Sequence, residues 1–378
     1  MTENKKTCLY DRHVALGALM QPFGGFIMPI QYSSIIEEHE AVRKDCGVFD
    51  VSHMGEVIIK GGDAEEFVSR IFTNDIKGAP DGKIFYGMMC HDDGGTVDDL
   101  LVYKMKDNEY FLVINAANID KDWDWIQRQA KAFIALYPTA DMELDHASDS
   151  YGQLAVQGPQ SEAVMQEVLG LQCAELVFYT AKTIDIGDEQ LIVSRTGYTG
   201  EDGFEIYGSH GYIQSAWDKL MESKRCKPCG LGCRDTLRFE VGLPLYGDEL
   251  SEEISPVMAG LGMFVKLDKE GGFIGCEALR QQKENGTDKK LIGIELEDKA
   301  IPRHGYAVLK DGRQVGTVTT GYHCISVDKS VCMALVESSA LTKDKEHWAE
   351  ETFEVQIRKK TFAGHRVAKK FYQKHYKK

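Results

Sequence analysis

The order of apolar and polar residues predicts helices and strands in alternation along the first part of the chain. Residues 34–47 place apolar side chains at helical spacing behind a serine that can cap the first turn, which predicts a helix ending near Gly47. Residues 55–61 read as a strand and residues 63–72 as a short helix. Further elements follow by the same criteria: strands at 83–90, 96–104 and 109–116, and a helix at 118–133 with Ile119, Trp123 and Ile126 on one stripe.

The second part of the chain first repeats this alternation of helices and strands and then predicts strands only. Residues 151–170 read as a strand, a Gly-Pro turn and a helix, and residues 190–208 as two strands joined by a glycine-rich connection. Helical patterns follow at 211–223 and 232–243. From about residue 288 the pattern is that of strands only, with a hairpin turn at Lys310–Arg313, which predicts a small barrel or jelly roll.

The chain has 378 residues, more than one hydrophobic core usually serves, so two or three domains are expected. The meander of strands with flanking helices at about 53–148 forms one unit, and the all-β region forms another. No run of about 18 apolar residues is present, which argues against a membrane span. The first residues show neither a signal core nor an amphipathic targeting pattern, so a cytoplasmic protein is expected.

Charge and cysteine content argue against several classes of function and of binding site. A net charge of -15 argues against general nucleic-acid binding. Residues 359–378 nevertheless hold eight Lys or Arg and no acid, which indicates either an acidic partner, an anionic ligand or a solvated terminus. Ten cysteines without a secretory signal are expected to be reduced. The cluster Cys226, Cys229 and Cys233 lacks a nearby fourth metal ligand, and small buried residues leading into a helix are the favoured interpretation.

Two adjacent carboxylates raise the main question of the sequence. Asp98 and Asp99 lie inside the strand "GGTVDDLLVYK", where aspartate is unfavourable and burial is costly without a partner. Side chains alternate along a strand, so the two acids point to opposite, mainly apolar faces. Either water reaches both carboxylates at the start of the strand, or one of them lies at the edge of a ligand cavity whose surroundings shift its pKa.

Two further stretches hold more charge and glycine than a scaffold needs. In "RTGYTGEDGFE", Gly197, Gly200 and Gly203 form no phosphate-binding motif and indicate a tight turn with positive φ. Glu205 follows in the returning strand; it is either a solvent-facing residue or an acceptor for the N–H groups of a flat heteroaromatic ring. Arg234 opens a helix, where a cation opposes the dipole, so a carboxylate or an anionic ligand is expected beside it.

Together these stretches resemble the T-protein family of the glycine cleavage system, the aminomethyltransferases. The resemblance rests on "FDVSHMGEV", "DGKIFYGMM", "GGTVDDLLVYK", "AVQGPQ", "SRTGYTGEDGFEI" and "GLGCRDTLRFEVGLPLYGDEL", which occur in the family's order. It implies an α+β fold of three domains in a cloverleaf around a central folate channel. The implied domains are residues 1–52 with 149–268, residues 53–148, and a C-terminal barrel at 269–378.

The resemblance also implies a reaction and its participants. The family transfers a one-carbon unit from the aminomethyl-lipoyl arm of H-protein to tetrahydrofolate, a co-substrate, and releases ammonia without a metal. The products are 5,10-methylenetetrahydrofolate and dihydrolipoyl H-protein, and P-protein and L-protein are functionally linked. By match to the family motif Asp99 is the catalytic carboxylate. The residues implied to bind the folate are Met54, Tyr86, Asn115, Tyr198, Glu205, Arg234 and Tyr376.

Two alternatives and one departure from the family pattern remain. The alternatives are another folate-dependent enzyme of this fold, such as a demethylase, and a non-enzymatic folate-binding protein. The "DDL" and "GEDGFE" matches favour the T-protein, since fold resemblance alone does not fix function. The departure is His323, Cys324 and Ile325, which replace a Phe-Ser-Pro core and leave the partner contact of the last domain open.

Overall fold

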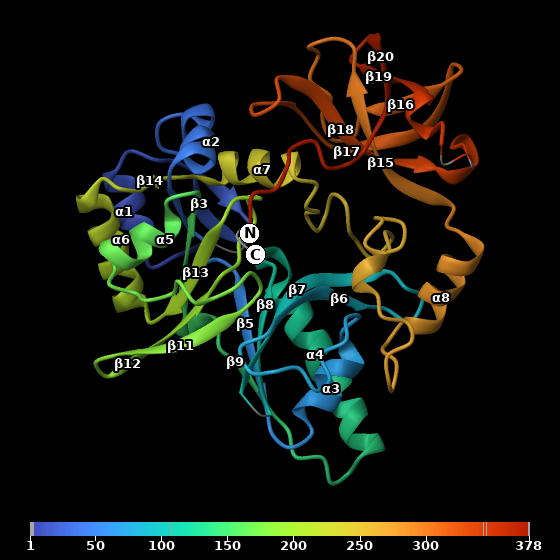
Figure 1. The fold of residues 1–378 in the computed structure, drawn as a ribbon. Helices are drawn as coiled ribbons and strands as arrows, with labels where there is room; N and C mark the ends of the chain where they lie inside the picture. Colours follow the sequence, from blue (N-terminus) through green and yellow to red (C-terminus); the bar gives the residue numbers. More distant parts are fainter. Residues whose placement is uncertain (1–3, 107, 343, 345, 377–378) are drawn as a thin grey trace.

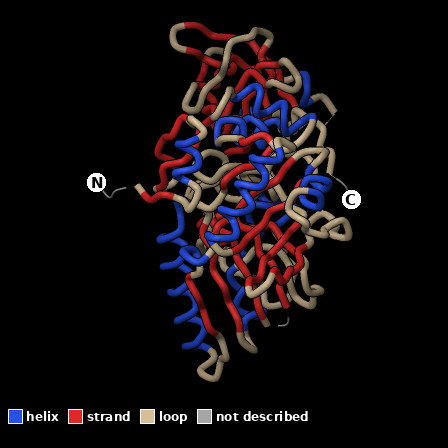
Figure 2. The backbone as a smooth tube through the Cα atoms, turned by 90° about the vertical axis from the view of Figure 1, so that its left-hand side faces the viewer, coloured by secondary structure: helices blue, strands red, loops and turns tan. Residues whose placement is uncertain are grey.

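The computed structural model describes residues 4–376, apart from residues 107, 343 and 345, as three lobes that meet near the middle of the molecule (Figure 1). Two lobes are built on open sheets with helices, and the third is a barrel. In the side view the barrel and the second sheet occupy opposite ends of the molecule (Figure 2). None of the described helices is both long and apolar enough to cross a membrane.

The first lobe is a six-stranded sheet whose strands come from distant parts of the chain. The order is β11 (Ala181–Ile186), β12 (Glu189–Ser194), β13 (Gly203–Gly208), β10 (Gly152–Gln157), β4 (Gly47–Asp50) and β14 (Lys227–Pro228). One face packs its apolar side chains, such as Phe204 and Ile206, against Trp217 of α6 (His210–Ser223). Alternation along β13 therefore turns Glu205 and Tyr207 to the opposite face.

Smaller elements complete this lobe. A three-stranded sheet of order β1-β3-β2 lies near the N-terminus, and α5 packs against the large sheet. The bounds are β1 (Lys5–Lys6), α1 (Tyr10–Ala15), β2 (Leu19–Phe23), β3 (Phe26–Gln31), α2 (Ile35–Lys44), α5 (Ser161–Glu167) and α7 (Leu231–Glu240). The sequence pattern predicted none of the elements before residue 34. The predicted helix at 34–47 begins as expected behind Ser34 but ends at Lys44, because Gly47 already belongs to β4.

The second lobe is a five-stranded antiparallel sheet covered on one face by two helices. Its order is β6 (Ile84–Cys90), β7 (Thr96–Lys106), β8 (Glu109–Ile114), β5 (Gly55–Lys60) and β9 (Glu143–His146). The helices α3 (Ala64–Ile71) and α4 (Ile119–Leu136) lie along it in Figure 1 and share its core. The predicted stripe on α4 is confirmed, since Ile119 and Ile126 are buried in this core and Trp123 packs against it, and Asp122 and Trp125 are buried on the same helix.

The third lobe confirms the predicted barrel. Six strands close in the order β15 (Lys289–Leu296), β18 (Lys329–Glu337), β17 (Arg313–Cys324), β16 (Ala307–Lys310), β19 (Thr352–Ile357) and β20 (Lys360–Val367). The turn between β16 and β17 pairs Lys310 with Arg313 and holds Asp311 and Gly312 at φ 53° and 74°, as a two-residue hairpin requires. The helix α8 (Cys276–Asn285) precedes the barrel.

After the barrel the chain returns to the first lobe, and its last described residues lie near the middle of Figure 1. The amides of Phe371 and Tyr372 donate to the carbonyl of Glu240, and the amide of His375 donates to that of Gly200. The basic C-terminal region is therefore a packed strap over its described part, and Lys377 and Lys378 lie outside the described residues. The α+β class and the barrel are confirmed, whereas the exact domain boundaries stay predictions.

Candidate functional site

Asp99 lies on β7 with a hydrogen-bond donor on each side. The hydroxyl of Tyr86, on β6, donates to Asp99 Oδ2 at 2.8 Å. The side-chain amide of Asn115, just after β8, donates to Asp99 Oδ1 at 3.0 Å. Three neighbouring elements thus bring together three of the residues that the sequence analysis selected.

Asp98 points to the other side of the strand and is fully buried. It accepts from the backbone N–H of Asn115 at 3.0 Å and from the side-chain amides of Asn115 and Asn118, each at 2.8 Å. The interpretation that water reaches both acids at the mouth of the strand is therefore wrong for Asp98. Because the Asn115 amide contacts both carboxylates, the two acids form one hydrogen-bonded unit.

A local irregularity of the sheet sets this geometry. The pairing of β6 with β7 shifts between Met89 and Cys90, so Thr96 pairs with Cys90 and Asp98 with Met89. The turn that starts β7 packs closely, since a side chain on Gly95 would lie 2.0 Å from the carbonyl oxygen of Glu252. Such bulges commonly redirect a side chain next to a functional site.

The environment of Asp99 gives it an unusual acidity. Burial, followed by the negative charge of Asp98, raises the pKa of Asp99 to about 7, although the hydrogen bonds from Tyr86 and Asn115 act in the opposite direction. A carboxyl group with this pKa exchanges protons readily near neutral pH. The arrangement fits a general base or an anion that stabilises a developing positive charge.

Glu205 is a second buried carboxyl group, on the inner face of the first sheet. It is 6% exposed, so the solvent-facing interpretation is wrong. The hydroxyl of Thr196 donates to its Oε2 at 2.6 Å and the amide of Gln153 donates to its Oε1 at 3.1 Å. Burial raises the pKa of Glu205. Its orientation is fixed by these two donors.

The glycine-rich loop before β13 is shaped by close packing more than by turns. Only Gly200 has a positive φ, of 84°, among the three glycines spaced by three residues. A side chain on Gly197 or Gly203 would lie 1.9 Å or 2.4 Å from the side chain of Gln157. The predicted positive-φ turn is thus right for one glycine and wrong for the other two.

Arg234 and Tyr198 lie beside one another on the same side of the first lobe. The Arg234 guanidinium stands 4.9 Å from the centre of the Tyr198 ring, and the Tyr198 hydroxyl donates to the carbonyl of Pro244. Arg234 Nη1 is buried and has no hydrogen-bond partner among the described residues. The expected carboxylate partner is therefore present only as the nearby charge of Glu205, and burial lowers the pKa of Arg234.

The two remaining predicted residues lie at the edges of this group. Met54 follows β4 and packs against the apolar clusters of both sheets. Tyr376 stacks on Phe178 with ring centres 4.1 Å apart, and its hydroxyl is close enough to Tyr179 to influence that residue electrostatically. Tyr376 therefore closes one side of the region without a hydrogen bond to Asp99 or Glu205 in the described contacts.

Sequence reasoning missed several polar residues between the two sheets. Buried atoms without a hydrogen-bond partner in the described structure include His53 Nδ1, both carboxylate oxygens of Glu56, and Gln153 Oε1. Burial lowers the pKa of His53 to about 4 and raises that of Glu56 well above its ordinary range. Unsatisfied buried donors and acceptors are rare in native proteins, so each of these atoms is a candidate for contact with a bound molecule.

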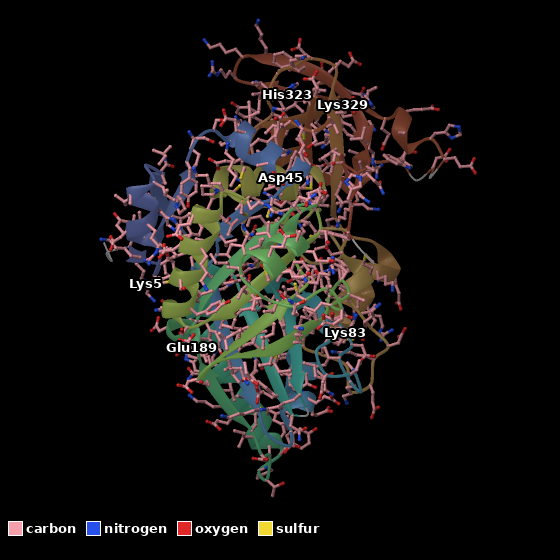
Figure 3. The ribbon with its side chains drawn as sticks, turned by 60° about the vertical axis from the view of Figure 1, so that its left-hand side comes forward. Lys5, Asp45, Lys83, Glu189, His323 and Lys329 are labelled. Carbon is pink, nitrogen blue, oxygen red and sulfur yellow. The ribbon has the colours of Figure 1, made fainter. Side chains whose placement is uncertain are left out.

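A groove with a volume of about 800 Å³ opens between the first lobe and the barrel. Tyr198 and Arg234 form part of its wall, and the remainder comes from β2, β3, α2, α7 and the barrel, with apolar residues such as Phe23, Ile35 and Leu231. His323, Cys324 and Ile325, which depart from the family pattern, also line it, and Figure 3 shows His323 on the barrel. The departure thus changes the surface of the groove rather than the surroundings of Asp99.

The cysteines carry no comparable site. Cys226, Cys229 and Cys233 are buried, and no cluster of metal-ligating side chains is found among the described residues. Cys46 Sγ lies 3.2 Å from Cys226 Sγ, and both cysteines are free thiols. The thiol of Cys90 is buried, which raises its pKa and makes it a poor nucleophile.

Comparison with known families gives matches along almost the whole chain. A family model described as the GCVT N-terminal domain matches residues 9–269. A second, described as the glycine cleavage T-protein C-terminal barrel domain, matches residues 289–373.

Individual relatives agree with these matches. An aminomethyltransferase of Caldanaerobacter subterraneus subsp. tengcongensis is 46% identical, over 99% of this chain and 97% of the relative. One of Bacillus licheniformis is 47% identical, over 98% of this chain and 99% of the relative. The crystal structure of a glycine cleavage system aminomethyltransferase T from Bartonella henselae superposes with a TM-score of 0.90 at 28% identity, covering 99% of both chains.

Proposed function

The chain belongs to the glycine cleavage T-protein family and is an aminomethyltransferase, and from this premise we propose that Asp99 is its catalytic carboxylate. The observation that carries the proposal is the position of Asp99 between Tyr86 and Asn115, where burial and Asp98 raise its pKa to about 7. Because the sequence and fold matches cover both the open-sheet lobes and the barrel, the proposal concerns the whole chain.

The reaction begins from an aminomethyl group on sulfur, S–CH2–NH3+, carried by the lipoyl arm of H-protein. The carbon–nitrogen and carbon–sulfur bonds break, and two bonds form from the carbon to N5 and N10 of tetrahydrofolate. The protons of these nitrogens end on the leaving ammonia and the dihydrolipoyl sulfur. Ionised Asp99 stabilises the positive charge that develops at the carbon and accepts a proton from the nucleophilic nitrogen.

The residues between the sheets fit tetrahydrofolate as co-substrate. Its pterin ring offers adjacent N–H and amino groups, which a carboxylate such as Glu205 accepts in pairs. Gln153 and Thr196 hold Glu205 in place for this contact. The buried, unpartnered Nη1 of Arg234 suits an anionic or carbonyl group of the same ligand. Met54, Tyr86, Tyr198 and Tyr376 provide the apolar walls.

H-protein is the proposed protein partner, since it presents the lipoyl arm, and P-protein and L-protein are linked to this chain through it. A folate-dependent demethylase of the same fold is the remaining alternative, because it shares the carboxylate and the folate but takes a different one-carbon donor.

Ammonia release from aminomethylated H-protein, with and without tetrahydrofolate, tests the proposal. We expect release in a one-to-one ratio with methylenetetrahydrofolate, and loss of both in Asp99→Asn. Asp124→Asn is a suitable control, because Asp124 is an exposed aspartate on α4. Folate binding without ammonia release contradicts the proposed donor, and full activity of Asp99→Asn contradicts the proposed catalytic residue.

A further inference from the structure

A chain of buried hydroxyl groups leads from Glu205 in the first lobe to the second lobe. Thr196 Oγ1 donates to Glu205 Oε2 at 2.6 Å and lies 2.6 Å from Ser194 Oγ. Ser194 Oγ lies 3.2 Å from the hydroxyl of Tyr103, which in turn lies 2.9 Å from the hydroxyl of Tyr207. All five residues are buried, so these groups depend on one another for their hydrogen bonds.

Glu205 is the acceptor at the end of this chain. Burial raises its pKa, but the hydrogen bonds from Thr196 and Gln153 and the charge of Arg234 favour the ionised form. Each carboxylate oxygen receives one hydrogen bond from the described residues, on Oε2 from Thr196 and on Oε1 from Gln153. Because a carboxylate accepts about four hydrogen bonds, each oxygen keeps room for a donor of the ligand.

The number of protons fixes the direction of the hydrogen bonds. Each hydroxyl carries one proton, and an ionised carboxylate carries none. Thr196 donates its proton to Glu205 and therefore accepts from Ser194. By the same count Ser194 accepts from Tyr103, and Tyr103 accepts from Tyr207. Burial, followed by the charge of Glu205, raises the pKa of both tyrosines, so they keep their protons at neutral pH and every hydroxyl is oriented toward Glu205.

Tyr103 connects this chain to the strand of the proposed catalytic acid. It lies on β7, four residues after Asp99, and side chains an even number of residues apart along a strand share a face. Its ring packs edge-to-face against Phe111 and Tyr207, with ring centres 5.8 Å apart in both pairs. One face of β7 therefore presents both Asp99 and the hydroxyl that leads to Glu205.

We propose that Tyr103 is a positioning residue for tetrahydrofolate, which orients the hydroxyl chain toward Glu205 and so holds the pterin ring in a fixed position relative to Asp99. Tyr103 acts through Ser194 and Thr196 rather than through the reacting atoms. The inference rests on the proposed contact of Glu205 with the pterin ring. It gives a residue of the second lobe a part in binding a ring whose acceptor belongs to the first lobe.

Loss of the Tyr103 hydroxyl breaks the chain in its middle. Ser194 then has no donor that fixes its hydroxyl, and Thr196 is less firmly oriented toward Glu205. The contact of Glu205 with the pterin ring is made before and during the reaction, so its weakening should raise the KM for tetrahydrofolate and leave kcat unchanged. A purely structural role would give the opposite result, because a smaller folded fraction lowers the apparent kcat at constant KM.

The first experiment compares Tyr103→Phe, which keeps the ring and its packing, with Tyr110→Phe. Tyr110 is a suitable control, since it is also buried in the second sheet and its hydroxyl donates to Glu65 of α3 at 2.7 Å. We expect the Kd and KM for tetrahydrofolate to rise about fivefold in Tyr103→Phe, as for loss of one net hydrogen bond, and to stay constant in Tyr110→Phe. Unchanged values in Tyr103→Phe, or an equal rise in Tyr110→Phe, overturn the proposal.

The second experiment is a double-mutant cycle with Thr196→Val, which cuts the chain next to Glu205. In that background Tyr103→Phe should change the Kd for tetrahydrofolate by less than about twofold, because the connection to Glu205 is already lost. A repeated fivefold rise overturns the proposal, since Tyr103 would then act by another route.

Ser194→Ala tests the same chain independently of the folding of Tyr103→Phe. It removes the hydroxyl between Tyr103 and Thr196, so it should raise the KM for tetrahydrofolate at constant kcat, and an unchanged KM overturns the proposal. Failure of the unaltered protein to release ammonia from aminomethylated H-protein would instead contradict the proposed function. The Kd values of the double-mutant cycle do not depend on turnover and would still decide whether Tyr103 acts through the chain.

Discussion

Asp50 is a buried aspartate and Asp99 a partly buried one, on strands of two different sheets, and their surroundings shift the two pKa values in opposite directions. Asp50 ends β4 and accepts from Thr7 Oγ1 at 2.6 Å and from the amide of Ser52 at 2.9 Å, with His13 Nε2 at 2.8 Å. Burial alone raises its pKa, but the contacts with His13, Thr7 and Ser52 bring it below the ordinary value.

At Asp99 the effect of burial is joined by that of a negative neighbour, Asp98, and the pKa rises to about 7. Asp50 therefore stays ionised across the neutral range, as a structural acid must, whereas Asp99 changes its charge within that range. The difference shows that burial alone does not set the charge of a buried acid, because hydrogen bonds and neighbouring charges either offset the effect of burial or add to it.

Replacement of Asp99, the proposed catalytic acid, gives the largest expected effect. Asp99→Asn should lower turnover by about 10²- to 10⁴-fold while leaving folate binding largely intact, because it removes only the anion. The raised pKa means that ionised Asp99 costs stability; this cost is absent below the ordinary value of 3.8 and complete above about 7. The variant should therefore unfold at an equal or higher temperature above pH 7. Lost folate binding would make Asp99 a binding residue instead.

Replacement of Asp50 should lower the free energy of unfolding without changing turnover. Asp50→Ala breaks a buried pair with His13, and such a loss costs about 3–5 kcal/mol. Urea denaturation measures this cost, and turnover per folded molecule is expected to be unchanged. A fall in turnover that matches that of Asp99→Asn would show that the two acids do not have separate roles.

A change of pH separates the two acids without mutation. Turnover should rise about tenfold per unit below pH 7 and level off above it, since the ionised form of Asp99 is the active one. Asp50 has a lowered pKa, so its contribution to stability is complete above the ordinary value of 3.8 and is lost as the pH falls below it. Loss of turnover with the same midpoint as acid unfolding would contradict this separation.

Removal of one neutral donor from each acid gives the smallest expected effects. Thr7→Val removes one hydrogen bond to charged Asp50 and should cost about 1.5–3 kcal/mol of stability at constant turnover. Tyr86→Phe removes a donor that favours ionised Asp99, so the acidic limb of turnover should move to higher pH by less than about one unit. A downward shift in Tyr86→Phe would contradict the assigned hydrogen bond.

The sequence predicted the regular elements best where their pattern was repeated and local. The strands around β7 and the two-residue turn at Asp311 follow from alternation and turn chemistry, which act over a few residues. The first 33 residues were not predicted, because β1 and β3 pair with each other and are stabilised by tertiary contacts rather than by an internal pattern. The burial of Asp122 on α4 was not predicted, because the helical stripe was identified from apolar residues alone.

The candidate site was predictable to the extent that family motifs mark it. Composition and spacing selected Asp98, Asp99, Glu205 and Arg234, but they did not distinguish Asp99, the proposed catalytic acid, from its neighbour Asp98. His53, Glu56 and Gln153 were missed because the strand pattern gives no sign of which polar atoms lack a partner. That property depends on how two sheets approach each other, which is a matter of contacts between residues far apart in the chain.

The pairing of β4 with β10 has a consequence for how the chain is made. Leu154 lies opposite Asp50, and the amide of Val51 donates to the carbonyl of Gln153, so the chain leaves the first sheet and re-enters it at one point. All five strands of the second sheet are encoded in between, from Gly55 to His146. During translation the second sheet can therefore fold before β10 is synthesised and pairs with β4, although the first sheet begins earlier in the chain. Mutations that slow the folding of the second sheet would leave the edge of β4 unpaired for longer. The expected result is aggregation rather than a loss of catalytic activity.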